Sequence, residues 1–433
     1  MAIAGDRRES RALRVAAASA VVLAVGALVA VAAWRLVGRR EAPAGPAGGA
    51  PVAPAPGAVA SAVRGVTDRE ILLGMVASFS GSNKERGRSM RAGWETALAT
   101  ANEAGGIHGR TLRLVALDDG YDPARTMPAL KDLVENRRVF ALVGNVGTAT
   151  AAVSVPYCMQ NKVLFYGALS GADLLRKTPP DRYVFNYRAG LAREGAAAVR
   201  YLVKVRRVSP RRIAVLVQMD DFGESGWRGA ARELESSGVG REQILKLGYP
   251  RNTADVRDAV AKLKKRPKAY DAVVMVATYK PAATFVIQAK EAGLNLFFIS
   301  VSADSNGLAE DLVGAGRRYT EKVAITQVVP VPGSQLPGVI RYRQLLEKHA
   351  LGEKPGSTTL EAWIGAQILL EALSRAGRDL DGEKVVEALE SIRGLDVGIG
   401  AVIDLGPGDH QGSDTVWGWL LQPDGTYRQI DLG

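Results

Sequence analysis

Between residues 67 and 300 the chain alternates short apolar runs with longer segments of helical periodicity. Short runs bounded by Gly, Pro or Asp are typical of strands buried on both faces of a parallel sheet, and segments of about ten or more residues with the longer period are typical of helices. Strands and helices that alternate in this way predict an α/β fold with two doubly wound, Rossmann-like lobes. The predicted strands are 71–79, 112–117, 139–144, 163–166, 213–217, 244–247, 272–276 and 297–300.

The helices between these strands are predicted from the same pattern, and the pattern changes toward the C-terminus. A crossing strand is predicted at 323–331, and short strands at 401–404, 416–421 and 427–430. The last pair surrounds Pro-Asp-Gly, which is a hairpin signal. The predicted helices are 88–104, 123–136, 190–204, 224–236, 254–265, 282–292, 336–349, 359–376 and 383–391.

The loop after the strand 139–144 is the first candidate for a ligand contact. Asn145, Gly147, Thr148 and Thr150 are turn and cap residues, so the chain turns tightly into a helix. The first amides of a helix have no intrahelical partner, and together with the positive end of the dipole they form a seat for a carboxylate. The alternative is that Thr148 only caps its helix, and the sequence leaves both readings open.

Other loops follow the carboxyl ends of parallel strands and therefore line one edge of each sheet, where α/β proteins bind their ligands. Phe79 belongs to the first of these loops, and Asp118 and Asp119 begin the second. Acidic residues directly after strands commonly cap the next helix. We expect that role for Asp118 and Asp119.

The N-terminal region has a different character. A basic tail, 1–14, precedes an unbroken apolar run, 15–34, that is long enough to cross a bilayer as a helix, although it could equally be an export signal. Arginines directly after the run favour an uncleaved anchor, with the rest of the chain on the outer face of the cytoplasmic membrane. Residues 41–66, rich in Ala, Pro and Gly, predict a disordered linker.

Charge and composition bear on three other kinds of function: nucleic-acid binding, cysteine chemistry and metal binding. Of the formal charge of +11, eight arginines against three acidic residues in 1–66 account for +5, and the remaining basic residues are spread along the chain. This distribution gives no indication of a nucleic-acid partner. The single cysteine, Cys158, lies in an apolar helical segment and is expected to be buried and inert. The three histidines show no metal-ligand spacing, and we expect neither a metal nor a cofactor.

Several motifs together resemble a known family. They are ILLGMVASFSG at 71–81, EAGGIHGRTLRLVALDDGYDP at 103–123, FALVGNVGTATA at 140–151, DDFG at 220–223, YKPAATFVIQAKEAGLN at 279–295 and TQVVPVP at 326–332. In this order and spacing they resemble the type I periplasmic binding proteins of branched-chain amino-acid ABC importers, over residues 67–433.

The resemblance implies two lobes joined by three hinge crossings, near 187–189, 326–331 and 393–397. Lobe 1 would comprise about 67–188 and 328–393, and lobe 2 about 189–327 and 394–433.

The resemblance also implies a ligand site. In the family, a hydroxyl and backbone amides hold the ligand carboxylate, an aromatic side chain of the second lobe closes over it, and an acidic residue meets the ammonium group. The residues assigned to this site are Phe79, Gly147, Thr148, Ala149, Ala168, Leu169, Ser170, Phe222, Tyr279, Ser302 and Asp304.

This chain departs from the family at the ammonium position, where it has Ser302, with Asp304 two residues later. A buried ammonium without an opposing carboxylate costs several kcal/mol, unless Glu361 or Asp221 supplies one. The expected ligand is therefore an amino acid or a related organic acid.

Each site residue also has a structural alternative. Phe222 and Tyr279 could pack on the sheet edge, and Ser170 and Ser302 could only satisfy loop backbone. Trp363, on an apolar helical face, is expected in the core.

The function expected from these observations is capture of a small solute outside the cytoplasmic membrane and delivery to ABC permease subunits. A membrane-anchored receptor ectodomain that signals to a partner protein is the alternative. An enzyme is not expected, because the chain has neither a G-x-S-x-G elbow nor a phosphate-loop signature.

Overall fold

The computed structural model describes residues 63–302 and 304–433. The predicted anchor or signal helix at 15–34 lies outside the described residues. Within the described ranges, we find no helix whose length and apolar character would let it span a bilayer. Residues 63–66, the end of the predicted linker, pack on the first sheet: Val66 is buried, and the amide of Leu72 donates to the Gly65 carbonyl.

The first lobe contains a sheet with the strand order β2-β1-β3-β4-β5, in which all neighbours are parallel. Its strands are β1 (Glu70–Ala77), β2 (Thr111–Asp118), β3 (Ala141–Val143), β4 (Leu164–Tyr166) and β5 (Val184–Phe185).

Side chains alternate across this sheet. Ile71 and Leu73 face the cluster that contains Met90 and Trp94, whereas Leu72 and Val76 face the opposite cluster. Helices therefore cover both faces: α2 (Lys84–Glu103), α11 (Ser357–Ala376), α10 (Pro337–His349) and α12 (Gly382–Glu390) on the first, and α3 (Pro123–Lys131) and α4 (Thr148–Gln160) on the second.

The second lobe contains a sheet with the strand order β14-β13-β10-β9-β8-β6-β7, in which β13 is antiparallel to both β10 and β14 and the other neighbours are parallel. The strands are β6 (Ile213–Gln218), β7 (Lys246–Tyr249), β8 (Ala272–Val276), β9 (Phe297–Ser300), β10 (Val323–Gln327), β13 (Trp417–Leu421) and β14 (Tyr427–Ile430). Its helices are α5 (Leu191–Arg200), α6 (Asp221–Ser236), α7 (Arg257–Lys264), α8 (Tyr279–Glu291) and α9 (Ser305–Ala315).

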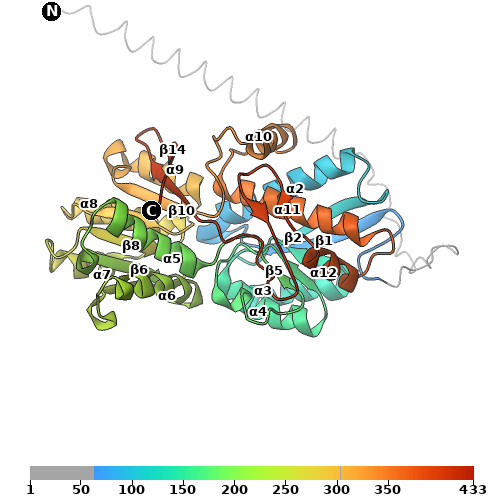
Figure 1. Cartoon of the computed structure of the whole chain (residues 1–433), viewed down its shortest axis with the longest axis horizontal. Helices are drawn as coiled ribbons and strands as arrows, with labels where there is room; N and C mark the ends of the chain where they lie inside the picture. The colour runs from blue at the N-terminus through green and yellow to red at the C-terminus, as the bar shows by residue number, and fades with distance from the viewer. Residues whose placement is uncertain (1–62, 303) are drawn as a thin grey trace, which may run out of the picture. The chain divides into compact units, whose positions relative to one another are not determined.

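In both sheets the chain order reverses at one place, between β1 and β3 in the first lobe and between β6 and β8 in the second. Crevices form outside the carboxyl ends of the strands at such switch points. Figure 1 shows the two groups of elements, with β6, β8 and α5 to α8 in one and β1, β2, α2, α3 and α4 in the other.

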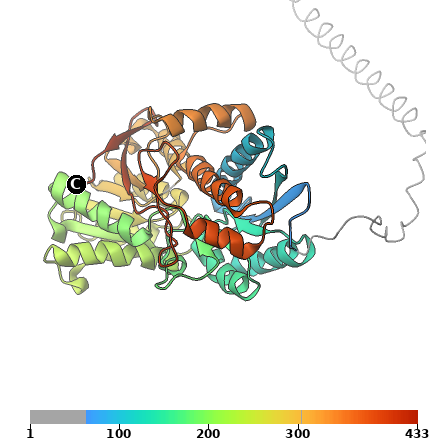
Figure 2. The same ribbon diagram turned by 45° about the vertical axis from the view of Figure 1, so that its right-hand side comes forward.

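Segments from late in the chain complete the first lobe. Figures 1 and 2 both show α11, drawn in orange-red, beside α2, drawn in blue. Trp363 of α11 is 2% exposed and its ring lies 6.0 Å from that of Tyr342, so the predicted core role is confirmed. Cys158 is buried, as predicted. A small two-stranded sheet, β11 (Leu395–Asp396) and β12 (Val402–Ile403), follows α12.

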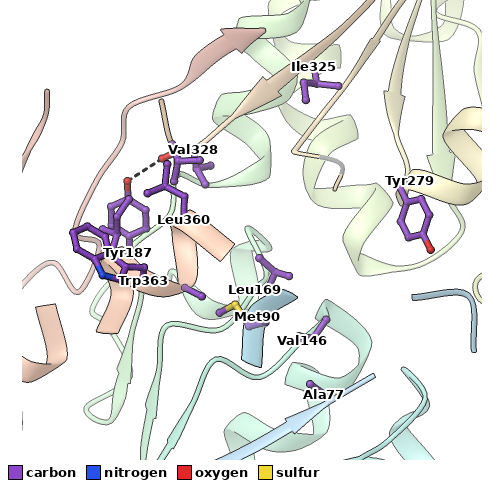
Figure 3. Packing of buried hydrophobic residues seen from close by; sticks show 14 of the residues in the cluster. Ala77, Met90, Val146, Leu169, Tyr187, Tyr279, Ile325, Val328, Leu360 and Trp363 are labelled. Carbon is purple, nitrogen blue, oxygen red and sulfur yellow. Dashed lines mark hydrogen bonds between the residues drawn. The ribbon is translucent and has the colours of Figure 1, made fainter. Parts of the chain in front are cut away.

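The segments that join the lobes contact each other. The Tyr187 hydroxyl donates to the Val328 carbonyl at 3.0 Å, and Figure 3 shows this bond beside Leu360 and Trp363. It connects the segment after β5 to the segment after β10. Two chain crossings are thus fixed to each other and to α11.

Two local predictions need correction. Asp118 and Asp119 do not cap a helix. Asp122 caps α3 through the amide of Ala124, at 3.0 Å, while Asp118 accepts from the amides of Phe79 and Gly120. Helix α9, which begins at Ser305, is also absent from the predicted helices.

Candidate functional site

A narrow, largely filled cavity lies between the lobes at the two switch points, with a volume of only about 10 Å³ open to a water-sized sphere. Loops at the carboxyl ends of first-lobe strands, the connecting segment after β5 and second-lobe loops all contribute to it. Its lining consists of Asn83, Arg86, Tyr121, Val146, Gly147, Thr148, Leu169, Ser170, Gly171, Arg188, Leu191, Phe222, Thr278 and Ser302.

The hydroxyl groups of Thr148 and Ser170 lie 2.7 Å apart and are hydrogen-bonded to each other. Both side chains are buried and line the cavity. The N-cap position of α4 is Gly147, and Thr148 makes no side-chain cap. Of the two readings of Thr148, capping of its own helix is therefore wrong, and its hydroxyl instead joins two loops of the first sheet.

Gly147 is required at its position. Its φ is 109°, a conformation that favours glycine, and an added Cβ would lie 2.2 Å from the Tyr121 ring. The tight turn thus brings the start of α4 against Tyr121.

Not every backbone amide of these loops is available to a ligand. The amides of Gly147, Leu169 and Ser170 donate to carbonyl groups of the same two loops, at 3.3, 2.7 and 2.8 Å. The amides of Thr148 and Ala149 have no acceptor within the helix, because they belong to its first turn. In these two loops, the hydroxyl pair and the amides at the start of α4 are therefore the polar groups that remain for an anion.

Arg86 is a cavity residue that the sequence analysis missed. It lies in the first turn of α2, is 7% exposed, and makes neither a hydrogen bond nor an ion pair with any residue that the structure describes. Burial and the nearby charge of Arg188 lower the pKa of its guanidinium, and the more weakly acting charges of Asp304 and Glu361 oppose this shift. The positive end of a helix dipole also disfavours a cation. Arg86 is thus a buried cation that its own protein does not neutralise by contact.

Arg188 is the second buried guanidinium at the cavity and is 2% exposed. Its Nη2 lies 3.3 Å from Glu194 Oε1 and also donates to the Ser302 hydroxyl, and its Nε lies 3.7 Å from Glu361 Oε1. Burial raises the pKa of Glu361, although Arg188 opposes this effect. Unlike Arg86, Arg188 is held by partners from α5, α11 and the loop after β9.

The structure brings six of the predicted site residues to the cavity: Gly147, Thr148, Leu169, Ser170, Phe222 and Ser302. Five others, namely Phe79, Ala149, Ala168, Tyr279 and Asp304, do not line it.

Tyr279 and Asp304 make structural contacts away from the cavity lining. Tyr279 is the first residue of α8 and is buried, with its ring 2.7 Å from the position of a Cβ on Gly307. Asp304 caps α9 through the amide of Gly307, at 2.8 Å, and accepts from the Thr358 hydroxyl at 2.9 Å. The family position expected to meet an ammonium group therefore holds no available carboxylate.

Tyr121 lines the cavity and connects the two lobes. Its hydroxyl accepts from Gln218 Nε2 at 3.2 Å, and its carbonyl accepts from Arg251 and Asn252 at 3.3 and 3.2 Å. Its own amide is held by Asp119 at 2.8 Å. The structure thus has its two lobes in hydrogen-bonded contact around the cavity.

A fold of two doubly wound lobes around such a cavity can be compared with known proteins. The family model described as periplasmic binding protein matches residues 70–425. The chain belongs to the periplasmic binding protein family. Its fold is that of the type I periplasmic binding proteins, as expected, and the family consists of solute-binding proteins rather than enzymes.

Individual relatives of this periplasmic binding protein agree with the family. The crystal structure of a possible leucine/isoleucine/valine-binding protein from Rhodopirellula baltica is 34% identical, has a TM-score of 0.80, and is matched over 86% of this chain and 98% of its own. A substrate-binding periplasmic protein from Ralstonia solanacearum is 29% identical, with a TM-score of 0.75 over 83% of this chain and all of its own. An amino acid binding protein from Pseudomonas aeruginosa is 24% identical over 335 residues, which are 74% of this chain and 83% of the relative.

Proposed function

We propose that this periplasmic binding protein captures a small carboxylate-bearing solute, an amino acid or a related organic acid, and delivers it to an ABC importer. The observation that carries the proposal is the unpaired, buried guanidinium of Arg86 in a cavity that also contains the Thr148 and Ser170 hydroxyl groups. Relatives named for amino acids or for leucine, isoleucine and valine support a carboxylate ligand.

Lobe closure would supply the binding mechanism. Part of the cavity wall belongs to each lobe, so a bound solute contacts both walls only when the lobes are together. The ABC permease would then receive the closed form. No bond of the solute needs to be broken in this cycle.

A thermal-shift screen of the full-length protein in mild detergent tests the carboxylate ligand. Each acid is compared with its uncharged amide. We expect one or more acids to stabilise the protein by about 2.7 kcal/mol at a hundredfold excess over Kd, and the amides not to stabilise it. Stabilisation by amides or sugars alone would contradict the proposal.

Delivery is tested separately with the permease and ATPase subunits reconstituted in vesicles. Addition of the protein with its solute should stimulate ATP hydrolysis, whereas either one alone should not. Solute binding without any such stimulation would instead favour a receptor.

The N-terminal region carries a second part of the proposal. We propose that residues 15–34 anchor the protein to the outer face of the cytoplasmic membrane, because the run is long enough to span it and is flanked by arginines. Membrane fractionation and N-terminal sequencing of the mature protein test this. Recovery of a soluble protein that begins after residue 34 would contradict it.

A further inference from the structure

We propose that the ligand is an organic anion without an α-ammonium group, and that Arg86 and Arg188 make the cavity select it. The inference rests on the proposed function, and it narrows the class of acid that the site accepts. It follows from the charges at the cavity and from the partners of the acidic side chains near it.

The cavity has a positive lining. Two of its side chains are guanidinium groups, Arg86 and Arg188, and within the described part of the chain none of its lining residues is Asp or Glu. An ammonium group there would meet like charges, which costs several kcal/mol, whereas an anion would neutralise Arg86.

The nearby acidic side chains already have partners. Both oxygens of Asp304 accept hydrogen bonds, from Gly307 and Thr358. Glu194 accepts from Arg188 through one oxygen and from the Thr326 hydroxyl, at 2.8 Å, through the other. Glu361 faces Arg188 at 3.7 Å. To recruit one of these carboxylates for an ammonium group, the protein would have to break a buried contact.

The hydroxyl of Ser302 is also engaged within the protein. Ser302 lines the cavity, but its hydroxyl accepts a hydrogen bond from Arg188. On the second-lobe wall, the Ser302 hydroxyl is thus engaged by Arg188 of the connecting segment and is not free to serve an ammonium donor. A keto, hydroxy or unsubstituted carboxylic acid avoids the repulsion that an amino acid would meet.

Calorimetric titration of the full-length protein in mild detergent with matched pairs tests the inference. The pairs are alanine and pyruvate, valine and its α-keto acid, phenylalanine and phenylpyruvate, and glutamate and α-ketoglutarate, each with the amide of the acid as an uncharged control. We expect the α-keto acid of the best pair to bind about a hundredfold more tightly than the amino acid, since like-charge contact costs several kcal/mol.

The outcomes separate the inference from the proposed function. An amino acid that binds as tightly as its keto acid, or more tightly, overturns the inference and leaves a carboxylate ligand in place. Amides that bind as tightly as the acids overturn both. Failure of every acid in the panel to bind at millimolar concentration also overturns both.

Substitutions in α2 test whether the Arg86 side chain selects keto acids over amino acids. Arg86→Gln should weaken binding of the keto acid by about tenfold to a hundredfold, because a charge-assisted hydrogen bond is lost, and should reduce the ratio between keto and amino acid. Arg86→Lys keeps the positive charge and should therefore keep most of the ratio between the affinities for the keto acid and the amino acid.

Arg91→Gln is the matched control on the same helix, because Arg91 is exposed and pairs with Glu95 at 2.7 Å. This variant should change neither the affinity for the keto acid nor the ratio between the affinities for the keto acid and the amino acid. A ratio that stays the same in Arg86→Gln would show that Arg86 does not select the ligand.

Discussion

Thr148 and Arg86 show how individual residues depart from local rules at the cavity. A threonine at the start of a helix usually caps it, yet the Thr148 hydroxyl bonds to Ser170. A buried cation normally has an anionic partner, yet Arg86 has none among the residues that the structure describes. Proteins tolerate such departures mainly at functional sites, where the ligand offsets their cost.

Removal of the Thr148 hydroxyl should affect the ligand more than the fold. Thr148→Val keeps the shape of the side chain but loses the bond to Ser170, so we expect carboxylate affinity to fall about tenfold, with a small change in melting temperature. Titration calorimetry and thermal unfolding measure the two effects.

Ser170→Ala should act through the same pair. The double variant should therefore lose less affinity than the two single variants added together. Unchanged affinity in Thr148→Val would show that the hydroxyl pair does not contact the ligand.

The cavity residues divide according to what fixes their position. Gly147, Thr148 and Ser170 directly follow strands, so the order of strands and loops was sufficient to place them at the sheet edge. Arg86 lies in the first turn of a helix and Arg188 lies on a connecting segment. These two arginines reach the cavity only because of how the lobes pack against each other, and no local pattern in the sequence predicts that packing.

At the scale of elements, the loop after β1 depends on Asp118. Its Oδ1 accepts from the amides of Phe79 and Gly120, at 2.7 and 2.9 Å, and its Oδ2 accepts from Arg125 at 2.6 Å. Burial alone would raise the pKa of Asp118, but these hydrogen bonds outweigh burial and lower the pKa to about 2. The ionised form is thus the one that the fold stabilises.

This shift predicts a pH dependence of stability. Because the pKa of Asp118 is lower in the folded protein than its ordinary value of about 4, its contribution should be complete above about pH 4 and be lost as the pH falls toward 2. Asp118→Asn should destabilise the protein by about 1–2 kcal/mol at neutral pH. Urea unfolding at several pH values measures the free energy of unfolding of both proteins. The difference between the variant and the unsubstituted protein should become smaller below about pH 4. A constant difference down to pH 2 would contradict this assignment.

The contact between α2 and α11 leaves no room for a side chain at Gly93. A Cβ there would lie 2.3 Å from the Thr359 carbonyl oxygen. Gly93→Ala should therefore force the helices apart and lower the free energy of unfolding by about 1–3 kcal/mol.

Gly314→Ala in α9 is the matched control, since no atom lies within 4 Å of its Cβ position. It should instead stabilise the protein by about 0.5–1 kcal/mol, because alanine favours a helix more than glycine does. Denaturant titration of both variants measures the difference, and equal effects would contradict the packing argument.

Most elements could be predicted because their periodicity is strong, and α9 shows where this fails. Its sequence, SNGLAEDLVGA, contains two glycines and a polar start, so its helical signal is weak. Asp304 was consequently assigned to a ligand loop, whereas in the structure it caps this helix. Because α9 was not predicted, the capping role of Asp304 could not be predicted either.

At the scale of the whole described unit, Tyr121 links the lobes. Its hydroxyl accepts a hydrogen bond from Gln218 of the second lobe. Tyr121→Phe removes this bond and keeps the ring against Gly147, so we expect the closed form to be less stable and ligand affinity to fall by a few-fold. Calorimetry and small-angle scattering with and without ligand measure affinity and closure.

Tyr157→Phe provides a control within the first lobe. The Tyr157 hydroxyl donates to Glu135 at 2.8 Å, and neither residue lines the cavity. This variant should affect stability alone. An equal loss of affinity in both variants would argue against a closing role for Tyr121.

The most direct test of the anion site is a crystal structure with the carboxylate that binds most tightly. We expect a carboxylate oxygen within hydrogen-bond distance of the Arg86 guanidinium and of the Thr148 or Ser170 hydroxyl, with both lobes in contact with the solute. A solute bound outside this cavity, or one whose uncharged end faces Arg86, would contradict this expectation.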